Sequence, residues 1–209
     1  MSWASHAKAL ALITGIVAMA LLHHGHVQAF IADVYESLRR RLPKPLRKRE
    51  VLLQPSLFQV HFDDPAVHYE VCVQRKTRSI EIGLHFEGAR EDNQRWADVL
   101  AGRAAEVQAK LGPGAELEEW TRAWTRLHES HPVAGAEWRP KVSLTPELVE
   151  ETAERIARYI EVLEPILRKE KGAKRGRPSP QAGAPRRGAG GGTASRSAAP
   201  RRRARSRRA

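Results

Sequence analysis

Cysteine and acidic residues are the scarce side chains in this sequence. Cys72 is the one cysteine among 209 residues, so no disulfide can form within the chain, which fits a reducing compartment. Residues 171–209 contain 13 of the 36 Lys and Arg residues and none of the 24 Asp and Glu residues. The remaining 23 basic and 24 acidic residues leave residues 1–170 with a net charge of −1. The formal charge of +12 therefore belongs to a C-terminal tail.

Several sequence motifs of enzymes are also missing. No Gly-rich loop follows a hydrophobic strand, because Gly190 to Gly192 lie within the tail. The chain has no Gly-x-Ser-x-Gly, no pair of cysteines and no His-Glu-x-x-His. The acid and Glu-x-Lys pattern of restriction-type nucleases is absent from the central strands. These absences lead us to expect a non-enzymatic binding protein that needs no cofactor.

The N-terminal segment, residues 1–27, carries one long apolar run. Residues 9–22 are 14 consecutive apolar or small residues, preceded by Lys8 and followed by a small-residue site at 27–29. This resembles a secretory signal, and the run is short for a transmembrane helix of about 20 residues. The cluster of Lys and Arg at 39–49 opposes export. A buried or frayed helix and an upstream start codon are the alternatives.

Residues 28–170 are expected to form one α+β domain. A helix over 28–42 is followed by three strands with alternating apolar positions, at 57–62, 67–74 and 79–87. A helix is expected from 92 to 111 and ends at Gly112-Pro113-Gly114. The last helix begins at Thr145 and Pro146, which are good capping and first-turn residues. The predicted fold is a three-stranded antiparallel meander plus a fourth strand, packed on two or three helices.

The segment 117–128, which reads LEEWTRAWTRLH, fits two templates. As a helix it places Leu117, Trp120, Trp124 and Leu127 on one face. As a strand it places Trp120, Arg122, Trp124, Arg126 and His128 on one face, and the Trp and Thr content favours this interpretation.

Three histidines are expected to form one row on the polar face of the meander. If residues 75–78 form the second turn, His68 faces His85 and Cys72 faces Glu81. If residues 63–66 form the first turn, His61 faces His68. Facing side chains have Cβ atoms about 4.5–5.5 Å apart, and imidazole is a good ligand for zinc and other transition metals. A divalent metal bound by these histidines, in a metal-binding or hydrolytic domain, is therefore one hypothesis.

Other polar residues of the sheet suggest a second hypothesis, in which this face binds a polar ligand instead of a metal. A face that binds a polar ligand would use Glu70, Glu81, Glu87, Arg122 and Arg126. The plainest alternative is a solvated sheet face, which must carry polar residues in any case. No histidine directly faces Cys72, so we expect an inert thiol.

A short motif in the tail, Lys174-Arg175-Gly176-Arg177-Pro178, resembles an AT-hook. In that family the two arginines lie along the minor groove of AT-rich DNA, and glycine lets the backbone approach the groove floor. The resemblance covers five residues and implies that Arg175 and Arg177 enter the groove, with Gly176 and Pro178 shaping the chain. The narrow groove of A-tracts attracts arginine because its negative potential is concentrated.

The whole tail, residues 171–209, is expected to be disordered and to bind polyanions, because it lacks apolar periodicity. DNA or RNA is the expected partner, and an anionic membrane or an acidic protein is the alternative. The expected location is the cytoplasm, in association with nucleic acid; the alternative is export or anchoring through residues 9–22. The residues expected to contact phosphate are Lys171, Lys174, Arg186, Arg187, Arg201, Arg202, Arg203, Arg205, Arg207 and Arg208.

Overall fold

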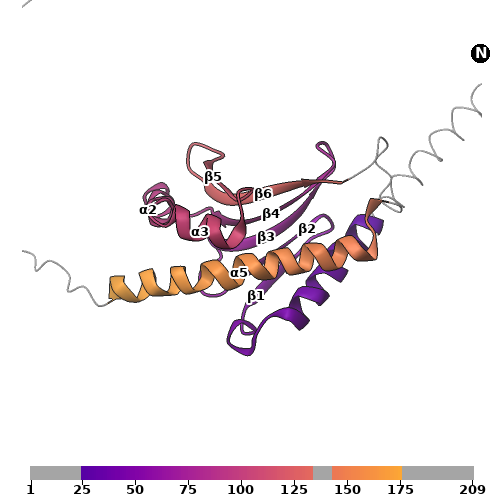
Figure 1. The fold of residues 1–209 in the computed structure, drawn as a ribbon, viewed down its shortest axis with the longest axis horizontal. Coiled ribbons are helices and arrows are strands. Elements are labelled where there is room, and N and C mark those ends of the chain that lie inside the picture. The colour runs from indigo at the N-terminus through magenta and orange to yellow at the C-terminus, as the bar shows by residue number, and fades with distance from the viewer. Residues whose placement is uncertain (1–24, 134–142, 176–209) are drawn as a thin grey trace, which may run out of the picture.

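The computed structural model describes residues 25–133 and 143–175, and it shows a six-stranded antiparallel sheet packed with helices (Figure 1). The first described element is a helix over residues 25–41, which we call the N-terminal helix. The elements that follow are η1 (Lys44–Leu46), β1 (Glu50–Leu53), β2 (Leu57–His61), β3 (Val67–Gln74), β4 (Ser79–Phe86), α2 (Arg90–Ala101), α3 (Ala104–Leu111), β5 (Glu116–Glu119), β6 (Thr125–Pro132) and α5 (Pro146–Arg175). The α+β class is therefore confirmed.

The strands follow the order β1-β2-β3-β4-β6-β5, and every neighbouring pair is antiparallel. Strands β3 and β4 lie at the centre, and their register pairs Cys72 with Glu81 and His68 with His85, as predicted. Strands β2 and β3 pair Val60 with Tyr69. Continuing that register by one residue places His61 opposite His68. The predicted turn over 75–78 is confirmed, whereas the first connection spans 62–66 and is one residue longer than predicted, because β2 ends at His61.

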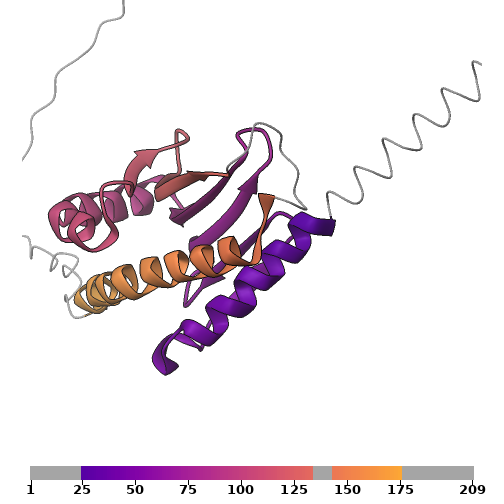
Figure 2. The same ribbon diagram turned by 45° about the vertical axis from the view of Figure 1, so that its right-hand side comes forward.

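One face of the sheet is covered by helices because its side chains are apolar. The alternating residues of β3 and β4 that face the helices are Val67, Tyr69, Val71, Val73, Ile80, Ile82, Leu84 and Phe86, and all are buried. The N-terminal helix and α5 lie side by side across this face in both views (Figures 1 and 2). The ring of Trp96 from α2 stacks on Phe86 at 6.0 Å between ring centroids. These contacts build one hydrophobic core between the sheet and the helices.

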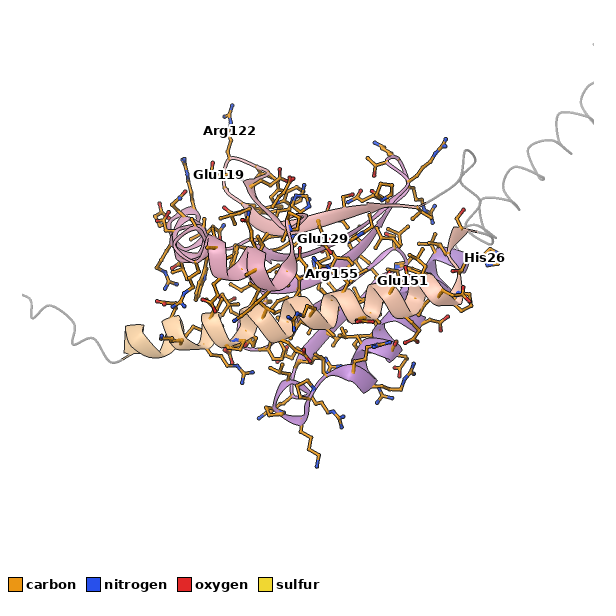
Figure 3. All side chains as sticks on the ribbon, in the orientation of Figure 1. His26, Glu119, Arg122, Glu129, Glu151 and Arg155 are labelled. Carbon is orange, nitrogen blue, oxygen red and sulfur yellow. The ribbon has the colours of Figure 1, made fainter. Side chains whose placement is uncertain are left out.

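A buried ion pair joins β6 to α5 within this helix-covered face (Figure 3). The guanidinium of Arg155 donates to both carboxylate oxygens of Glu129 and to the carbonyl of Leu111. His131 lies 2.7 Å from Oε1 of Glu129. Burial alone would raise the pKa of Glu129, but the hydrogen bonds from Arg155 and His131 lower it to about 2. This carboxylate is therefore fully partnered in the folded state.

Three parts of the predicted fold need correction. Segment 117–128 is neither a helix nor one strand: β5 and β6 form a hairpin, and residues 120–124 form its loop. The expected helix over 92–111 is two helices, because α2 ends at Ala101 and Gly102 caps it. Strand β1 was not predicted, since its four residues are mostly exposed and do not alternate.

The last helix begins as predicted and continues further than predicted. Thr145 accepts a hydrogen bond from the amide of Leu148 at 3.3 Å, as an N-cap residue does. The helix extends through Pro165 to Arg175, so residues 171–175 of the predicted tail are helical. None of the described helices is both long enough and apolar enough to cross a membrane. Residues 9–22, on which the prediction of a signal or anchor rests, lie outside the described residues.

The two edges of the sheet differ in character. Strand β1 forms one edge and exposes Leu52 and Leu53. Strand β5 forms the other edge and carries Glu116, Glu118 and Glu119. Charged residues on an edge strand discourage pairing with another chain, so β5, with three glutamates, is better protected than β1, whose one charged residue is Glu50.

Candidate metal centre

The polar face of the sheet carries a row of four side chains on neighbouring strands. His61, His68 and His85 come from β2, β3 and β4, and Arg126 follows because β4 and β6 pair it with His85. The histidine rings of His68 and His85 stack at 5.5 Å between centroids. The prediction of three histidines in one row is therefore confirmed by the register, and Arg126 extends the row.

This face is not the solvated surface that the alternation suggested. His68 and His85 are each 2% exposed, and Glu81 is 7% exposed. The ring of Trp120, from the β5–β6 loop, meets His85 edge-on at 6.0 Å between centroids. Neighbouring polar side chains and this ring cover the histidines, so the row is part of the protein interior.

His68 presents one nitrogen that has no partner. Its Nδ1 lies 2.8 Å from the carbonyl oxygen of Pro65, a distance at which a neutral ring donates its proton from Nδ1. Its Nε2 is buried and has no hydrogen-bond partner among the described residues. Burial lowers the pKa of His68, which favours the neutral ring. The lone pair on Nε2 is therefore available to an electrophile.

His85 has no hydrogen-bond partner at either ring nitrogen within the described part of the chain. Its Nδ1 lies 3.7 Å from a carboxylate oxygen of Glu87, and its Nε2 lies 3.6 Å from one of Glu81. Both separations exceed the length of an N–H···O hydrogen bond. A buried polar group without a partner costs on the order of 1–3 kcal/mol, so these separations single out His85 among the buried polar residues.

The two carboxylates beside His85 differ in their other partners. Glu81 accepts a 2.6 Å hydrogen bond from Arg126, which also bonds Glu118 at 2.7 Å. Glu87 has only histidines close to it in the ionic contacts of this cluster, with Nδ1 of His85 at 3.7 Å. Glu87 is therefore the carboxylate that remains available to a cation.

Two groups of potential ligands share His85. The ligand atoms of His68, His85 and Glu87 lie within 4.8 Å of one another, and the same limit holds for Glu70, Glu81 and His85. In the second group Glu70 already accepts a 2.8 Å hydrogen bond from Gln59, and Glu81 accepts the bond from Arg126. Arginine would repel a cation bound there, so the first group is the better metal site.

Charge balance on this face also favours a cation. The carboxylates of Glu70, Glu81 and Glu87 contribute three negative charges at neutral pH. Arg126 contributes at most one positive charge, because its guanidinium also pairs with Glu118. Two negative charges therefore remain beside two buried rings, and one divalent ion would neutralise them.

Two of the predicted site residues lie away from this cluster. The Nε2 of His61 lies 3.7 Å from a carboxylate oxygen of Glu50, and His61 belongs to neither ligand group. Arg122 lies at the tip of the β5–β6 loop and points away from the sheet (Figure 3). Glu70, Glu81, Glu87 and Arg126 do surround the histidines. Trp120 and the carbonyl of Pro65 were missed, since neither belongs to the polar side chains of a strand.

Two further predictions can be placed on the structure. Burial raises the pKa of Cys72 to about 12, and Glu70 and Glu81 add to the rise, so the thiol stays protonated at neutral pH. Lys171 lies 3.1 Å from a carboxylate oxygen of Asp63. The side chains of the other residues predicted to bind nucleic acid, from Lys174 to Arg208, lie outside the described residues.

The chain matches no protein-family model, and no curated protein or solved structure shows significant similarity to it.

Proposed function

We propose that this protein binds one divalent transition-metal ion through Nε2 of His68, Nδ1 of His85 and the carboxylate of Glu87. The observation that carries the proposal is His85, a ring 2% exposed with both nitrogens unpartnered between two carboxylates. Two imidazoles and a carboxylate suit zinc and its neighbours better than magnesium or calcium, which prefer oxygen ligands.

The groups around the proposed ligands support this assignment. Ligating histidines usually donate their second N–H to a carbonyl or a carboxylate, which fixes the ring. The carbonyl of Pro65 has this position for His68. For His85 the nearest group on the Nε2 side is Glu81, at 3.6 Å, and Arg126 in turn holds Glu81. The second ligand group is therefore best understood as the support for the first.

The burial of the site favours metal binding over hydrolysis. A tetrahedral ion held by three side chains has a fourth position, which in hydrolytic centres is open to water and substrate. Here His68 and His85 are buried and Trp120 lies against His85. Ligand atoms of a tetrahedral zinc ion lie about 3.4 Å apart, given bonds of about 2.0–2.1 Å, so the cluster would contract slightly on binding.

The test is metal affinity and content of the full chain, purified without a tag and titrated with zinc. Residues 23–26 read HHGH and could bind metal by themselves. All variants therefore carry His23→Ala, His24→Ala and His26→Ala. One zinc per chain is expected, with binding lost in His68→Ala/His85→Ala. His61→Ala and His131→Ala are the matched controls and should keep it. Unchanged zinc binding in the double variant would disprove the site.

A second function, nucleic-acid binding, is supported by the segregation of charge. We propose that the tail binds DNA or RNA, because residues 171–209 hold 13 basic and no acidic side chains. Engagement of about six phosphates would give a log–log salt dependence with a slope of roughly −5. Preference for AT-rich duplex over GC-rich duplex would support the AT-hook interpretation of Arg175 and Arg177.

Removing residues 176–209 tests this second function, because it deletes ten arginines and spares α5. Duplex binding at low salt should fall sharply in the shortened chain. Equal binding by the two chains would rule out the tail as the nucleic-acid site. Localisation in the cytoplasm with nucleic acid is part of this proposal and depends on the same result.

A further inference from the structure

The β5–β6 loop, residues 120–124, presents two exposed tryptophans. Trp120 is 41% exposed and Trp124 is 37% exposed, and their ring centroids lie 5.8 Å apart. The other large apolar side chains that the described residues expose are Leu52 and Leu53, on the opposite edge of the sheet. Large exposed aromatic rings that lie together mark an interaction surface more often than scattered apolar residues do.

Hydrogen bonds hold this loop in one shape. The hydroxyl of Thr121 accepts from the amides of Ala123 and Trp124 at 3.2 and 2.9 Å. The side-chain amide of Asn93, a residue 2% exposed on α2, donates through Nδ2 to the carbonyl of Ala123 at 2.7 Å. Beneath the loop, the guanidinium of Arg126 lies 4.9 Å from the centroid of the Trp120 ring. The tryptophans are therefore preorganised, which lowers the entropy cost of binding.

Acidic side chains outnumber basic ones around the two rings: β5 carries Glu116, Glu118 and Glu119, and Arg126 is shared between Glu118 and Glu81. Glu118 is paired with Arg126, and its second contact is His128 at 3.0 Å. Glu119 and Arg122 lie together at the tip of the hairpin (Figure 3). A polyanion would therefore gain contact with the rings and no electrostatic attraction from this surface, so its attraction has to come from the tail.

The position of the loop relates it to the tail. The β5–β6 hairpin and the C-terminal end of α5 lie toward the same end of the molecule in both views (Figures 1 and 2). The chain continues for 34 residues beyond α5, and ten of these are arginine. An extended segment of that length spans about 110 Å, so a polyanion bound by the tail can also reach the loop.

We propose that Trp120 and Trp124 stack the bases of a single-stranded nucleic acid that the tail captures. The proposal rests on the nucleic-acid function of the tail. Exposed aromatic rings bind bases of any sequence, whereas bases inside a duplex are already stacked and cannot use them. The tail supplies attraction to phosphate and the loop supplies the distinction between single strand and duplex.

The experiment measures binding of labelled oligothymidylate and of a labelled duplex to the full chain by fluorescence anisotropy, over a series of salt concentrations. Trp120→Ala/Trp124→Ala should weaken single-strand binding about 10-fold or more at fixed salt, because stacking on each ring is lost. Duplex affinity and the salt slope should not change, because the tail is intact. Leu52→Ala/Leu53→Ala is the matched control, since it removes two exposed apolar side chains elsewhere.

Two further variants separate stacking from structural damage. Trp120→Phe/Trp124→Phe should keep most of the single-strand affinity, because phenylalanine retains a flat aromatic face. Trp124→Ala alone should still weaken binding, and it leaves the Trp120 ring over His85. The melting temperature of each variant shows whether it is folded.

Each remaining outcome decides one proposal. Single-strand affinity in the Trp variant equal to that of the Leu control overturns the stacking proposal and leaves the tail proposal standing. Unchanged binding after removal of residues 176–209 overturns the tail proposal, while the Trp variant still reports on the loop. Loss of binding to phosphatidylserine vesicles in the Trp variant, without loss of single-strand binding, would assign the surface to a membrane instead.

Discussion

Two buried polar clusters occupy opposite faces of the same sheet, and they differ in how completely their members are paired. On the helix-covered face, Glu129 receives hydrogen bonds from Arg155 and lies beside His131. On the other face, His85 lies between two carboxylates and bonds to neither. The central group of each cluster is buried, with Glu129 at 5% and His85 at 2% exposure.

The difference between these clusters indicates their roles. A buried charge with a full set of partners inside the chain holds two elements together, here β6 and α5. A buried group whose partners stand slightly too far away is complete only when something else is bound. Burial alone would not have separated the two roles; the hydrogen-bond geometry does.

The largest effect is expected from breaking the paired cluster. Arg155→Met leaves the Glu129 carboxylate buried with His131 as its remaining partner, and should cost about 3–5 kcal/mol of unfolding free energy. Urea denaturation measures this loss. Arg155→Met/Glu129→Gln removes the unpaired charge and should recover part of it. A single variant as stable as the wild type would show that the pair contributes nothing.

Acid should break the same cluster more gradually. The pKa of Glu129 in the folded protein is about 2, below the ordinary value of 4.5. Its stabilisation is therefore fully present above pH 4.5 and is lost as the pH falls from 4.5 toward 2, by on the order of 3 kcal/mol. The measurement compares unfolding free energies of the wild type and Glu129→Gln across this range. Parallel curves for the two proteins would contradict the assigned pKa.

A smaller effect is expected at the unpaired cluster when its support is changed. Glu81→Gln keeps the size of the side chain and weakens the contact that orients His85, so zinc affinity should fall about 10–100-fold. Competition with a chelator of known affinity measures this change. Glu116→Gln, on the edge strand β5, is the control. An unchanged affinity in Glu81→Gln would remove Glu81 from the site.

The central sheet was predictable because two short turns set its register. Turn lengths alone place His68 opposite His85 and Cys72 opposite Glu81, and alternation then assigns every side chain to a face. Strand β1 was not predictable in this way, since it has four residues and no alternation. The break in the expected helix at 92–111 depends on Gly102, which ends α2 although the apolar pattern continues.

The sequence predicted which residues form the site, but it did not predict that the histidines are buried. Alternation placed His68, His85 and Glu87 on one face, but it also implied that this face is wet. Trp120, which lies against the ring of His85, comes from a hairpin loop that neither template for 117–128 contained. A side chain that covers a residue distant from it in the sequence, as Trp120 covers His85, leaves no local signal in that sequence. The unpartnered nitrogens of His85, which distinguish a site from a surface, became visible only with the geometry.

The unequal edges of the sheet set a limit on self-association. Strand β1 exposes apolar side chains at one edge, whereas glutamates line β5 at the other. If two copies paired through their β1 strands, the symmetric contact would consume the open edge of both at once. The glutamates would then form both ends of the joined sheet and discourage growth beyond a twelve-stranded dimer.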